Sequence, residues 1–494
     1  ARGGNAVDAA LAAAITLTVV EPTGNGLGSD AFCILWDGQD LHGLNASGAA
    51  PMAWTPDRFA GASEMPFRGW DSVTVPGAVS AWAELSRRFG VLDFAALFEP
   101  AIRHASDGFI VSPVIADLWR RGAEVLADQP GFAETFLRDG RPPVAGERFV
   151  NEALADSLRQ IAATGGRAFY EGALAEQMVA AAEENGGALT MEDLARHRPD
   201  WCGTLSMEFD DVALHEIPPN GQGIAALMAL GILRHTPVRD FGPDDAMALH
   251  YQIEATKLAF RDMDAYVADS PAMTEITPAA LLDADYLAGR AAEISAEKAQ
   301  DFGSGAPRHG GTVYLSAADA SGMMVSFIQS NYAGFGSGVA VPGTGIHMQN
   351  RGAGFTLEAD HPNCVAPGKR PFHTIIPGFL MKGGRPLMSF GVMGGPMQAQ
   401  GHVQMTLRTQ LWGQDVQTAA DAPRWRVVEG LEVACETTIE AQTLDRLREM
   451  GHEITLETPD NAFGFGGAQL IQRLPGGGYG AGSDPRKDGQ AAGF

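Results

Sequence analysis

A glycine-rich stretch separates two parts of this chain that differ in character. Residues 303–311 read GSGAPRHGG, which offers little side-chain bulk for packing as a helix or a strand. The pattern before this stretch is mostly helical, whereas the pattern after it is mostly strands and turns. We therefore predict layers of α and β elements around one shared core.

Several stretches carry clear secondary-structure signals. Residues 5–20 are apolar on most sides and too short to cross a membrane, so they predict a buried helix. Residues 244–265 predict the longest helix. Further expected elements are strands over 312–316 and 323–329, a hairpin of 375–380 with 386–392, and helices over 397–411 and 439–450.

Thr312 stands where the glycine-rich stretch meets the first of these later strands. If the bond between Gly311 and Thr312 is cut, Thr312 gains a free α-amine beside its own hydroxyl. Such an amine has a pKa of about 7.7–8.0, so part of it is an unprotonated base near neutral pH. It could take the hydroxyl proton without a histidine, as N-terminal threonine nucleophiles do. Gly-Thr pairs also occur at residues 203–204 and 343–344, so a loop that ends at a strand is the alternative interpretation.

A second stretch, residues 389–396, runs from a predicted strand through Gly394 and Gly395 into a predicted helix. Glycine amides are unshielded, and a helix N-terminus adds positive potential, so the two amides could stabilise an oxyanion. A tight turn between strand and helix is the alternative. The sequence lacks a Gly-x-Ser-x-Gly elbow, a His-Glu-x-x-His motif and a Gly-x-Gly-x-x-Gly motif after a strand.

Composition limits the classes of molecule that the protein could bind. A formal net charge of −25 argues against nucleic acid and anionic membranes as partners. The four cysteines lie far apart and show no metal-ligand spacing, so we expect no metal, no cofactor and no disulfide framework. This favours a cytoplasmic location. A periplasmic or secreted location is the alternative, because the chain begins without Met and the true N-terminus is expected to be missing.

The ordered series of short motifs along nearly the whole chain resembles the γ-glutamyltransferase family of N-terminal-nucleophile hydrolases, in its shorter bacterial γ-glutamyltransferase-like branch. The motifs that carry the resemblance are GGNAVDAA at 3–10, VPGAV at 75–79, ASDGF at 105–109, FYEG at 169–172, EATKLAF at 254–260, Thr312, Gly322, GSG at 336–338, KRP at 369–371, and Gly394 with Gly395.

This resemblance implies an α+β protein with a four-layer αββα fold and a proenzyme that cuts itself between Gly311 and Thr312. Residues 1–311 would form a large subunit and residues 312–494 a small subunit, which together make one structural domain. Thr312 would be the nucleophile, and the amides of Gly394 and Gly395 the oxyanion hole. The run Ser330, Asn331 and Tyr332 would line the substrate pocket.

The chain also departs from the family at the positions that hold the amino-acid end of a γ-glutamyl group. Residues 45–51, NASGAAP, lack the family's arginine before Ala-Pro, and Gly354 occupies the position of the acidic residue, with Arg351 nearby. His373 and Thr374 replace the paired serines after KRP, and Val313 replaces a threonine. The segment 355–369 is shorter than the family's lid loop.

A zwitterionic amino-acid end needs a cation and an anion at a fixed separation. We therefore predict an amidohydrolase that forms an acyl ester on Thr312, with Arg351, His373 and Thr374 facing a small acid that has no α-amine. A short lid favours hydrolysis over transfer. The alternatives are a true γ-glutamyltransferase or glutathione hydrolase, an oxamate-type amidohydrolase, and an unprocessed, non-catalytic binding protein. The expected partners are a small-molecule substrate, the two subunits of one precursor, and a second copy in a homodimer.

Overall fold

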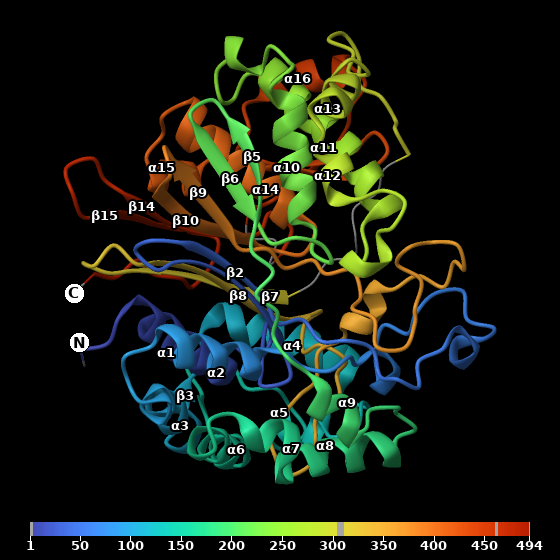
Figure 1. Cartoon of the computed structure of the whole chain (residues 1–494), viewed down its shortest axis with the longest axis vertical. Coiled ribbons are helices and arrows are strands. Elements are labelled where there is room, and N and C mark those ends of the chain that lie inside the picture. Colours follow the sequence, from blue (N-terminus) through green and yellow to red (C-terminus); the bar gives the residue numbers. More distant parts are fainter. Residues whose placement is uncertain (1–2, 304–310, 460–462, 494) are drawn as a thin grey trace. The chain divides into compact units, whose positions relative to one another are not determined.

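The computed structural model describes residues 3–303, 311–459 and 463–493 and contains two compact units (Figure 1). The first unit comprises the described parts of Ala1–Cys202 and Gly310–His373, and the second those of Gly203–His309 and Thr374–Gly493. Each unit therefore combines chain from both sides of the expected cleavage point. The predicted division into large and small subunits is a different division, and it stays a prediction.

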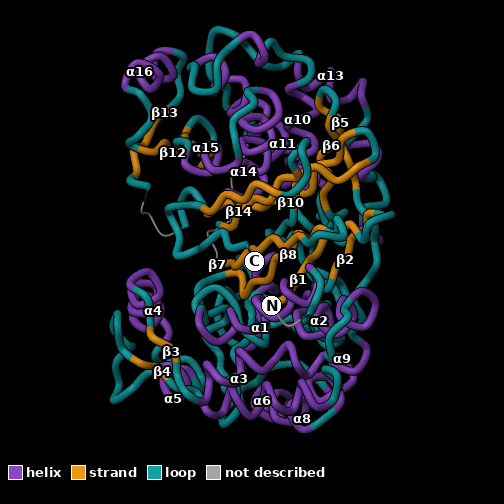
Figure 2. Tube along the Cα trace, turned by 90° about the vertical axis from the view of Figure 1, so that its left-hand side faces the viewer, coloured by secondary structure: helices purple, strands orange, loops and turns teal. Residues whose placement is uncertain are grey.

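The first unit is built on a sheet of four antiparallel strands in the order β2-β1-β8-β7 (Figure 2). Its strands are β1 (Asp30–Trp36), β2 (Leu41–Asn45), β3 (Phe109–Ile110), β4 (Arg148–Phe149), β7 (Gly311–Ala318) and β8 (Met324–Tyr332). Its helices are α1 (Ala6–Val20), α2 (Ala78–Phe89), α3 (Glu99–Ser106), α4 (Pro113–Leu126), α5 (Phe132–Phe136), α6 (Glu152–Ala163), α7 (Arg167–Glu171), α8 (Ala173–Glu184) and α9 (Met191–Arg196), with short turns η1 (Pro56–Phe59), η2 (Trp70–Ser72), η3 (Phe94–Phe98) and η6 (Arg351–Gly354).

Helices α1 and α2 cover one face of this sheet (Figure 1). Alternate residues of β1 and β8, such as Cys33 and Phe327, join their apolar side chains in one core. A capping box of Asn5 and Asp8 starts α1, because each side chain accepts a backbone amide of the other residue. The buried helix expected over 5–20 is confirmed.

The second unit is built on a sheet of six antiparallel strands in the order β15-β14-β10-β9-β6-β5, with a separate sheet β11-β12-β13. Its strands are β5 (Leu205–Phe209), β6 (Val212–Glu216), β9 (Gly378–Lys382), β10 (Arg385–Met393), β11 (Trp425–Glu429), β12 (Glu432–Glu436), β13 (Glu453–Glu457), β14 (Gly467–Arg473) and β15 (Tyr479–Ser483). Its helices are α10 (Gly223–Leu233), α11 (Ala246–Tyr266), α12 (Pro278–Leu281), α13 (Ala284–Ala291), α14 (Met397–Thr406), α15 (Val416–Asp421) and α16 (Ala441–Glu449), with short turns η4 (Val238–Asp240), η5 (Ser270–Ala272) and η7 (Leu407–Leu411).

Most predicted elements occur with shifted ends. The longest helix is α11, as expected, and the predicted hairpin is β9 with β10. The helix expected over 397–411 is α14, which continues into a wider π-type turn at η7. The strand expected to begin at Thr312 begins one residue earlier, because Gly311 already pairs with Tyr332. Among the described residues, no helix combines the length and the apolar character needed to cross a membrane.

Candidate active site

Thr312 lies in an irregularity of the first unit's sheet. β7 pairs with β8 through Gly311 opposite Tyr332 and Val313 opposite Gln329, and the register shifts between these two pairs. Between these pairs Thr312 faces two residues of β8, Ser330 and Asn331, so the extra residue of the bulge belongs to β8. Only 1% of the Thr312 surface is exposed. The bulge therefore brings two β8 residues to a buried hydroxyl that follows the Gly311 carbonyl.

Ser330 on β8 joins the groups around this hydroxyl. Thr312 Oγ1 donates to Ser330 Oγ at 3.1 Å, and Ser330 Oγ donates to the Gly311 carbonyl oxygen at 2.7 Å. The Tyr332 amide donates to the same hydroxyl oxygen at 2.8 Å, and Arg351 Nη2 donates to it at 2.7 Å. One serine thus connects the expected nucleophile, the expected cleavage site and a cation.

Tyr332 and Arg351 support Ser330 from two sides. Tyr332 has a φ of 77°, which is rare for a residue with a side chain. The Arg351 guanidinium lies 4.8 Å from the centre of the Tyr332 ring, where a cation–π contact is favourable. Arg351 belongs to η6 and is buried, and burial lowers its pKa to about 10. The guanidinium is still the charged form at neutral pH.

Asp30 is a candidate functional residue that we did not predict. Its Oδ1 accepts the amides of Gly77 at 2.9 Å and Gly48 at 3.3 Å, and its Oδ2 lies 3.1 Å from His373 Nε2. Burial raises the pKa of the Asp30 carboxyl to about 7, although the Arg351 cation and both amides oppose this rise. An aspartate at the head of an apolar strand was the available signal in the sequence.

His373 is held in its neutral form by the same surroundings. Burial lowers its pKa well below the usual range, and the Arg351 cation lowers it further. The neutral ring packs 4.8 Å from the Phe32 ring and bonds Asp30 through Nε2. His373 and Arg351, both predicted from sequence as substrate-facing, therefore share one electrostatic environment.

Two other predicted pocket residues have different surroundings. Asn331 follows Ser330 on β8 and is buried like it. Its amide group bonds Ser29 Oγ and His347 Nε2, each at 2.8 Å. Thr374 belongs to the second unit, where its carbonyl oxygen accepts Gln222 Nε2. Their substrate roles stay predictions, as do those of Ser330 and Tyr332.

Gly394 and Gly395 form the turn between β10 and α14 in the second unit. The Gly394 carbonyl accepts the Met397 amide, and the Gly395 carbonyl accepts Gln398 N at 3.2 Å and Gln222 Nε2 at 2.8 Å. Within the described residues, neither glycine amide donates a hydrogen bond. The carbonyl oxygens of the turn thus accept structural hydrogen bonds. Its amides stay available as donors, which an oxyanion hole requires.

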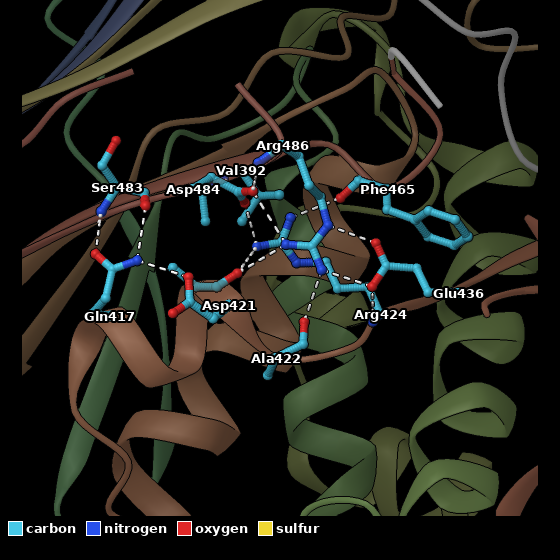
Figure 3. Close-up of polar contacts among 12 residues, drawn as sticks. Val392, Gln417, Asp421, Ala422, Arg424, Glu436, Phe465, Ser483, Asp484 and Arg486 are labelled. Carbon is cyan, nitrogen blue, oxygen red and sulfur yellow. Dashed lines mark hydrogen bonds and ion pairs between the residues drawn. The ribbon is translucent and has the colours of Figure 1, made fainter. Parts of the chain in front are cut away.

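The loop before β14 supports this turn. Gly394 has a φ of 132°, and a Cβ there would lie 2.8 Å from the Gly466 Cα, so only glycine fits. Arg424 Nη1 in turn donates to the Phe465 carbonyl at 2.9 Å (Figure 3). The loop that packs on Gly394 is therefore fixed by a buried arginine.

Arg424 is part of a buried network of two arginines and two carboxylates (Figure 3). It bonds Asp484 at 2.6 Å, and Asp484 also accepts the Ala468 amide at 2.7 Å, at the beginning of β14. Arg486 bonds both oxygens of Glu436 at 2.6 Å and reaches Asp484 at 3.1 Å. The network holds backbone on both sides of Gly466 in place.

In the two segments where the resemblance implies that recognition charges are missing, side chains and backbone are tightly packed. Ser47, in the segment without arginine, is fully buried, and both its amide and its hydroxyl donate to Asn45 Oδ1. At Gly354 a side chain would overlap the Phe372 carbonyl oxygen. Asn363 Nδ2 also donates to the Gly354 carbonyl at 2.7 Å, so the backbone cannot easily move away.

A buried cluster of three side chains outside the candidate active site resembles a metal site. His250, Glu254 and His452 could each offer a ligand atom, and these atoms lie within 4.8 Å of one another. However, Lys257 Nζ already neutralises Glu254 at 2.9 Å, and His250 bonds His452 at 2.9 Å and the Ser295 carbonyl at 2.7 Å. Protein groups therefore already bond both His250 nitrogens, His452 Nε2 and both Glu254 oxygens, and among the described residues only His452 Nδ1 of this cluster lacks a partner.

Comparison with known proteins places these observations in a family. The family model described as gamma-glutamyltranspeptidase matches residues 1–494. A glutathione hydrolase-like proenzyme of Bacillus subtilis is 37% identical over 508 residues, which cover 100% of this chain and 95% of that protein. An oxamate amidohydrolase proenzyme of Klebsiella pneumoniae is 37% identical over 504 residues, which cover 100% of this chain and 94% of that protein.

One solved structure is similar to this chain over its whole length. The crystal structure of cephalosporin acylase from Bacillus halodurans matches with a TM-score of 0.95 and 46% identity, and covers 100% of this chain and 92% of that chain. These likenesses confirm the predicted family and the predicted fold class, the α+β fold of N-terminal-nucleophile hydrolases. The relatives carry different activity names, so the substrate has to be argued from the residues of this chain.

Proposed function

This chain belongs to the γ-glutamyltranspeptidase family of N-terminal-nucleophile amidohydrolases, and we propose that Thr312 is its nucleophile after self-cleavage of the Gly311–Thr312 bond. One observation carries this proposal. The Thr312 hydroxyl and the Gly311 carbonyl oxygen both bond Ser330 Oγ, within a bulge that holds them side by side. A nucleophile held beside its own preceding carbonyl is arranged for attack on that carbonyl.

Cleavage would yield subunits of residues 1–311 and 312–494 and an α-amine on Thr312. The amine then takes the Thr312 hydroxyl proton, and the oxygen attacks the substrate amide carbon. The tetrahedral oxyanion is stabilised by the amides of Gly394 and Gly395, whose donor capacity supports this role. The leaving amine departs with the proton, and water attacks the acyl ester to regenerate Thr312.

The proposed substrate is an amide of a small acid without an α-amino group. The segment 45–51 without an arginine and the lack of space for a side chain at Gly354 support this, because a γ-glutamyl end requires both a cation and an anion. Arg351, His373 and Thr374 are the proposed substrate-facing groups. The short segment 355–369 supports hydrolysis over transfer, because water reaches an acyl ester that is not covered by a long lid.

The first experiment tests the nucleophile. Purified wild-type protein should separate on a denaturing gel into pieces of residues 1–311 and 312–494, and Thr312→Ala should stay whole and inactive because it lacks the attacking oxygen. Intact mass after mixing with an amide should show the acyl group on the smaller piece only. An uncut wild-type chain with hydrolase activity would refute Thr312, and an uncut chain without activity would favour the non-catalytic binding protein.

The second experiment tests the substrate class. Hydrolysis of oxamate and simple acyl amides is compared with that of a γ-glutamyl anilide, with and without a dipeptide acceptor. We expect the simple amides to be preferred and the acceptor to change little. A strong preference for the anilide would instead identify a true γ-glutamyltransferase or glutathione hydrolase, which the family membership keeps as the second candidate.

We further propose a cytoplasmic location and a homodimer for this protein. All four cysteines are free thiols, which supports a reducing compartment such as the cytoplasm. Fractionation of the source cells tests this against a periplasmic or secreted location. Light scattering of the purified protein would distinguish the homodimer from a monomer.

A further inference from the structure

We propose that Gln222 and Gln398 are positioning residues for hydrolysis, which hold the turn between β10 and α14 so that its glycine amides face the oxyanion. This inference rests on the proposed function, because it takes the amides of Gly394 and Gly395 as the oxyanion donors. The two glutamine side chains are called the glutamine clamp below. The clamp and the turn belong to the same compact unit, the second.

Gln222 joins two separate stretches of backbone. Its Nε2 donates to the Gly395 carbonyl at 2.8 Å and also to the Thr374 carbonyl. Carbonyl oxygens can only accept, so the side-chain nitrogen, which carries two protons, has to face both of them. Gln222 is fully buried and directly precedes α10, every residue of which is buried. A buried helix therefore fixes the side chain that ties the glycine turn to Thr374.

Gln398 ties the same two stretches from the other end of the turn. It is the second residue of α14 and is fully buried. Its backbone amide donates to the Gly395 carbonyl at 3.2 Å, and its Oε1 accepts the Ile376 amide at 3.0 Å. The Gly395 carbonyl thus accepts from both clamp residues, and the segment 374–376 is bonded by both side chains.

The glycine turn needs such support because its backbone can rotate. Gly394 has a φ of 132° and Gly395 a φ of 60°, and residues without a side chain leave these conformations easily. In a planar trans peptide the N–H and the C=O point in opposite directions. The Gly394 carbonyl accepts the Met397 amide at 3.2 Å, so the Gly395 amide points away from Met397. Rotation of this peptide would turn the donor away from the oxyanion.

The clamp costs stability, which argues against a purely structural role. Among the described residues, Gln222 Oε1 and Gln398 Nε2 are buried without a hydrogen-bond partner. A buried polar atom without a partner is unfavourable, whereas an apolar side chain of the same shape avoids this cost. The chain accepts the cost at both positions. We infer that the paired atom of each side-chain amide, Gln222 Nε2 or Gln398 Oε1, is the one that the enzyme needs.

The expected kinetic effect follows from when the oxyanion exists. Its charge develops only in the transition state, so donors that are fixed in place beforehand stabilise that state and not the bound substrate. Loss of the clamp should therefore lower kcat and leave KM nearly unchanged. General destabilisation of the fold would instead reduce the amount of folded enzyme.

The test is hydrolysis by protein that is already cut at Thr312, with rates expressed per cut molecule. The substrate is whichever of oxamate, a simple acyl amide and a γ-glutamyl anilide the wild type cleaves fastest. Loss of one oxyanion donor typically lowers kcat by about 100- to 1000-fold. The amides are loosened rather than removed in Gln222→Met, so its kcat should fall by at least about tenfold, and KM should change by less than about threefold.

Gln398 tests the clamp independently. Gln398→Met removes the acceptor of the Ile376 amide and should lower kcat by at least about threefold. Gln398→Glu keeps an oxygen acceptor in either protonation state and loses only the nitrogen that has no partner. It should recover most of the kcat that Gln398→Met loses. A Gln398→Glu enzyme as slow as Gln398→Met would overturn the role of this acceptor.

Gln404 provides the matched control. It lies later in α14, is buried, and donates from Nε2 to the Trp425 carbonyl at 2.9 Å. Gln404→Met loses a similar buried hydrogen bond and should keep the wild-type kcat. The proposal is overturned if Gln222→Met and Gln398→Met keep the wild-type kcat, if Gln404→Met loses as much as they do, or if the loss appears in KM alone.

Thr312→Ala is measured in parallel with the intact mass of the acylated wild type. If wild type carries the acyl group on Thr312 and both methionine variants are as fast as wild type, the clamp fails and the proposed function stands. If Thr312→Ala hydrolyses the amide as fast as wild type, the proposed function fails, and the clamp proposal fails with it.

Discussion

At the scale of single residues, buried ionisable side chains distinguish the candidate active site. The resemblance implies that two charges for an amino-acid end are missing, whereas Asp30, Arg351 and His373 are buried in the first unit and interact with one another. A neutral His373 and a cationic Arg351 leave Asp30 as the group whose charge changes near neutral pH.

Asp30→Asn should remove a pH dependence of stability. The folded pKa of Asp30, about 7, is raised above its ordinary value of 3.8, so the folded chain holds this proton more tightly than the unfolded chain. This stabilisation is fully present below about pH 4 and is lost as the pH rises through about 7. It amounts to at most about 4 kcal/mol, at about 1.4 kcal/mol for each pKa unit.

The measurement is the free energy of unfolding by urea at pH 5 and at pH 8. Asparagine keeps an oxygen for the Gly48 and Gly77 amides, so the variant should fold. Wild type should lose more stability than the variant between the two pH values. Equal slopes for both proteins would show that Asp30 does not titrate in this range.

At the scale of elements, the groups of the candidate active site lie at the ends of strands. Thr312 lies at the beginning of β7 and Ser330 near the end of β8, while Gly394 and Gly395 follow the end of β10. These strand ends depart from regular backbone pairing, and the regularly paired residues beside them hold them in place. In the second unit, the network around Arg424 does this for the loop that supports Gly394 (Figure 3).

Arg424→Gln should strongly destabilise the folded protein. The substitution removes the bonds to Phe465 and Asp484 and leaves a buried carboxylate with fewer partners. Removal of one partner from a buried ion pair typically costs about 3–5 kcal/mol. Arg446→Gln is the control, because the Arg446–Glu449 pair is exposed on α16 and should contribute less than about 1 kcal/mol. Thermal or urea melts that shift equally for both variants would contradict this role.

At the scale of the whole molecule, each of the two units contains strands from both expected subunits. β1 and β2 precede the cleavage point, and they share one sheet with β7 and β8, which follow it. β5 and β6 likewise share the second unit's sheet with β9 and β10. Each unit therefore needs strands from both pieces.

The cut pieces should consequently stay together. Separation would break the pairing of β1 with β8 and of β6 with β9, and it would expose both cores to water. Size-exclusion chromatography in native buffer should show both pieces in one peak, and they should separate only in denaturant. A native peak that contains one piece alone would refute this prediction.

Much of the fold could be predicted from local pattern. The buried helix over 5–20 and the long helix over 244–265 are long, strongly patterned segments, and they appear as α1 and α11. Apolar periodicity suffices there because each helix satisfies its own backbone hydrogen bonds. Strand ends were less predictable: β7 begins at Gly311 because of its pairing with Tyr332 at the end of the next strand, β8.

By itself, the sequence determined the family, the fold class and the candidate nucleophile, because ordered short motifs and a threonine behind a glycine-rich stretch are local properties of the chain. Only the tertiary structure revealed the partners of that threonine. Ser330 bonds both Thr312 and Arg351, and His373 bonds Asp30, although these residues lie at separated positions in the sequence. Hydrogen bonds act over a few ångströms in space rather than along the chain, so the folded sheet decided which of these groups meet.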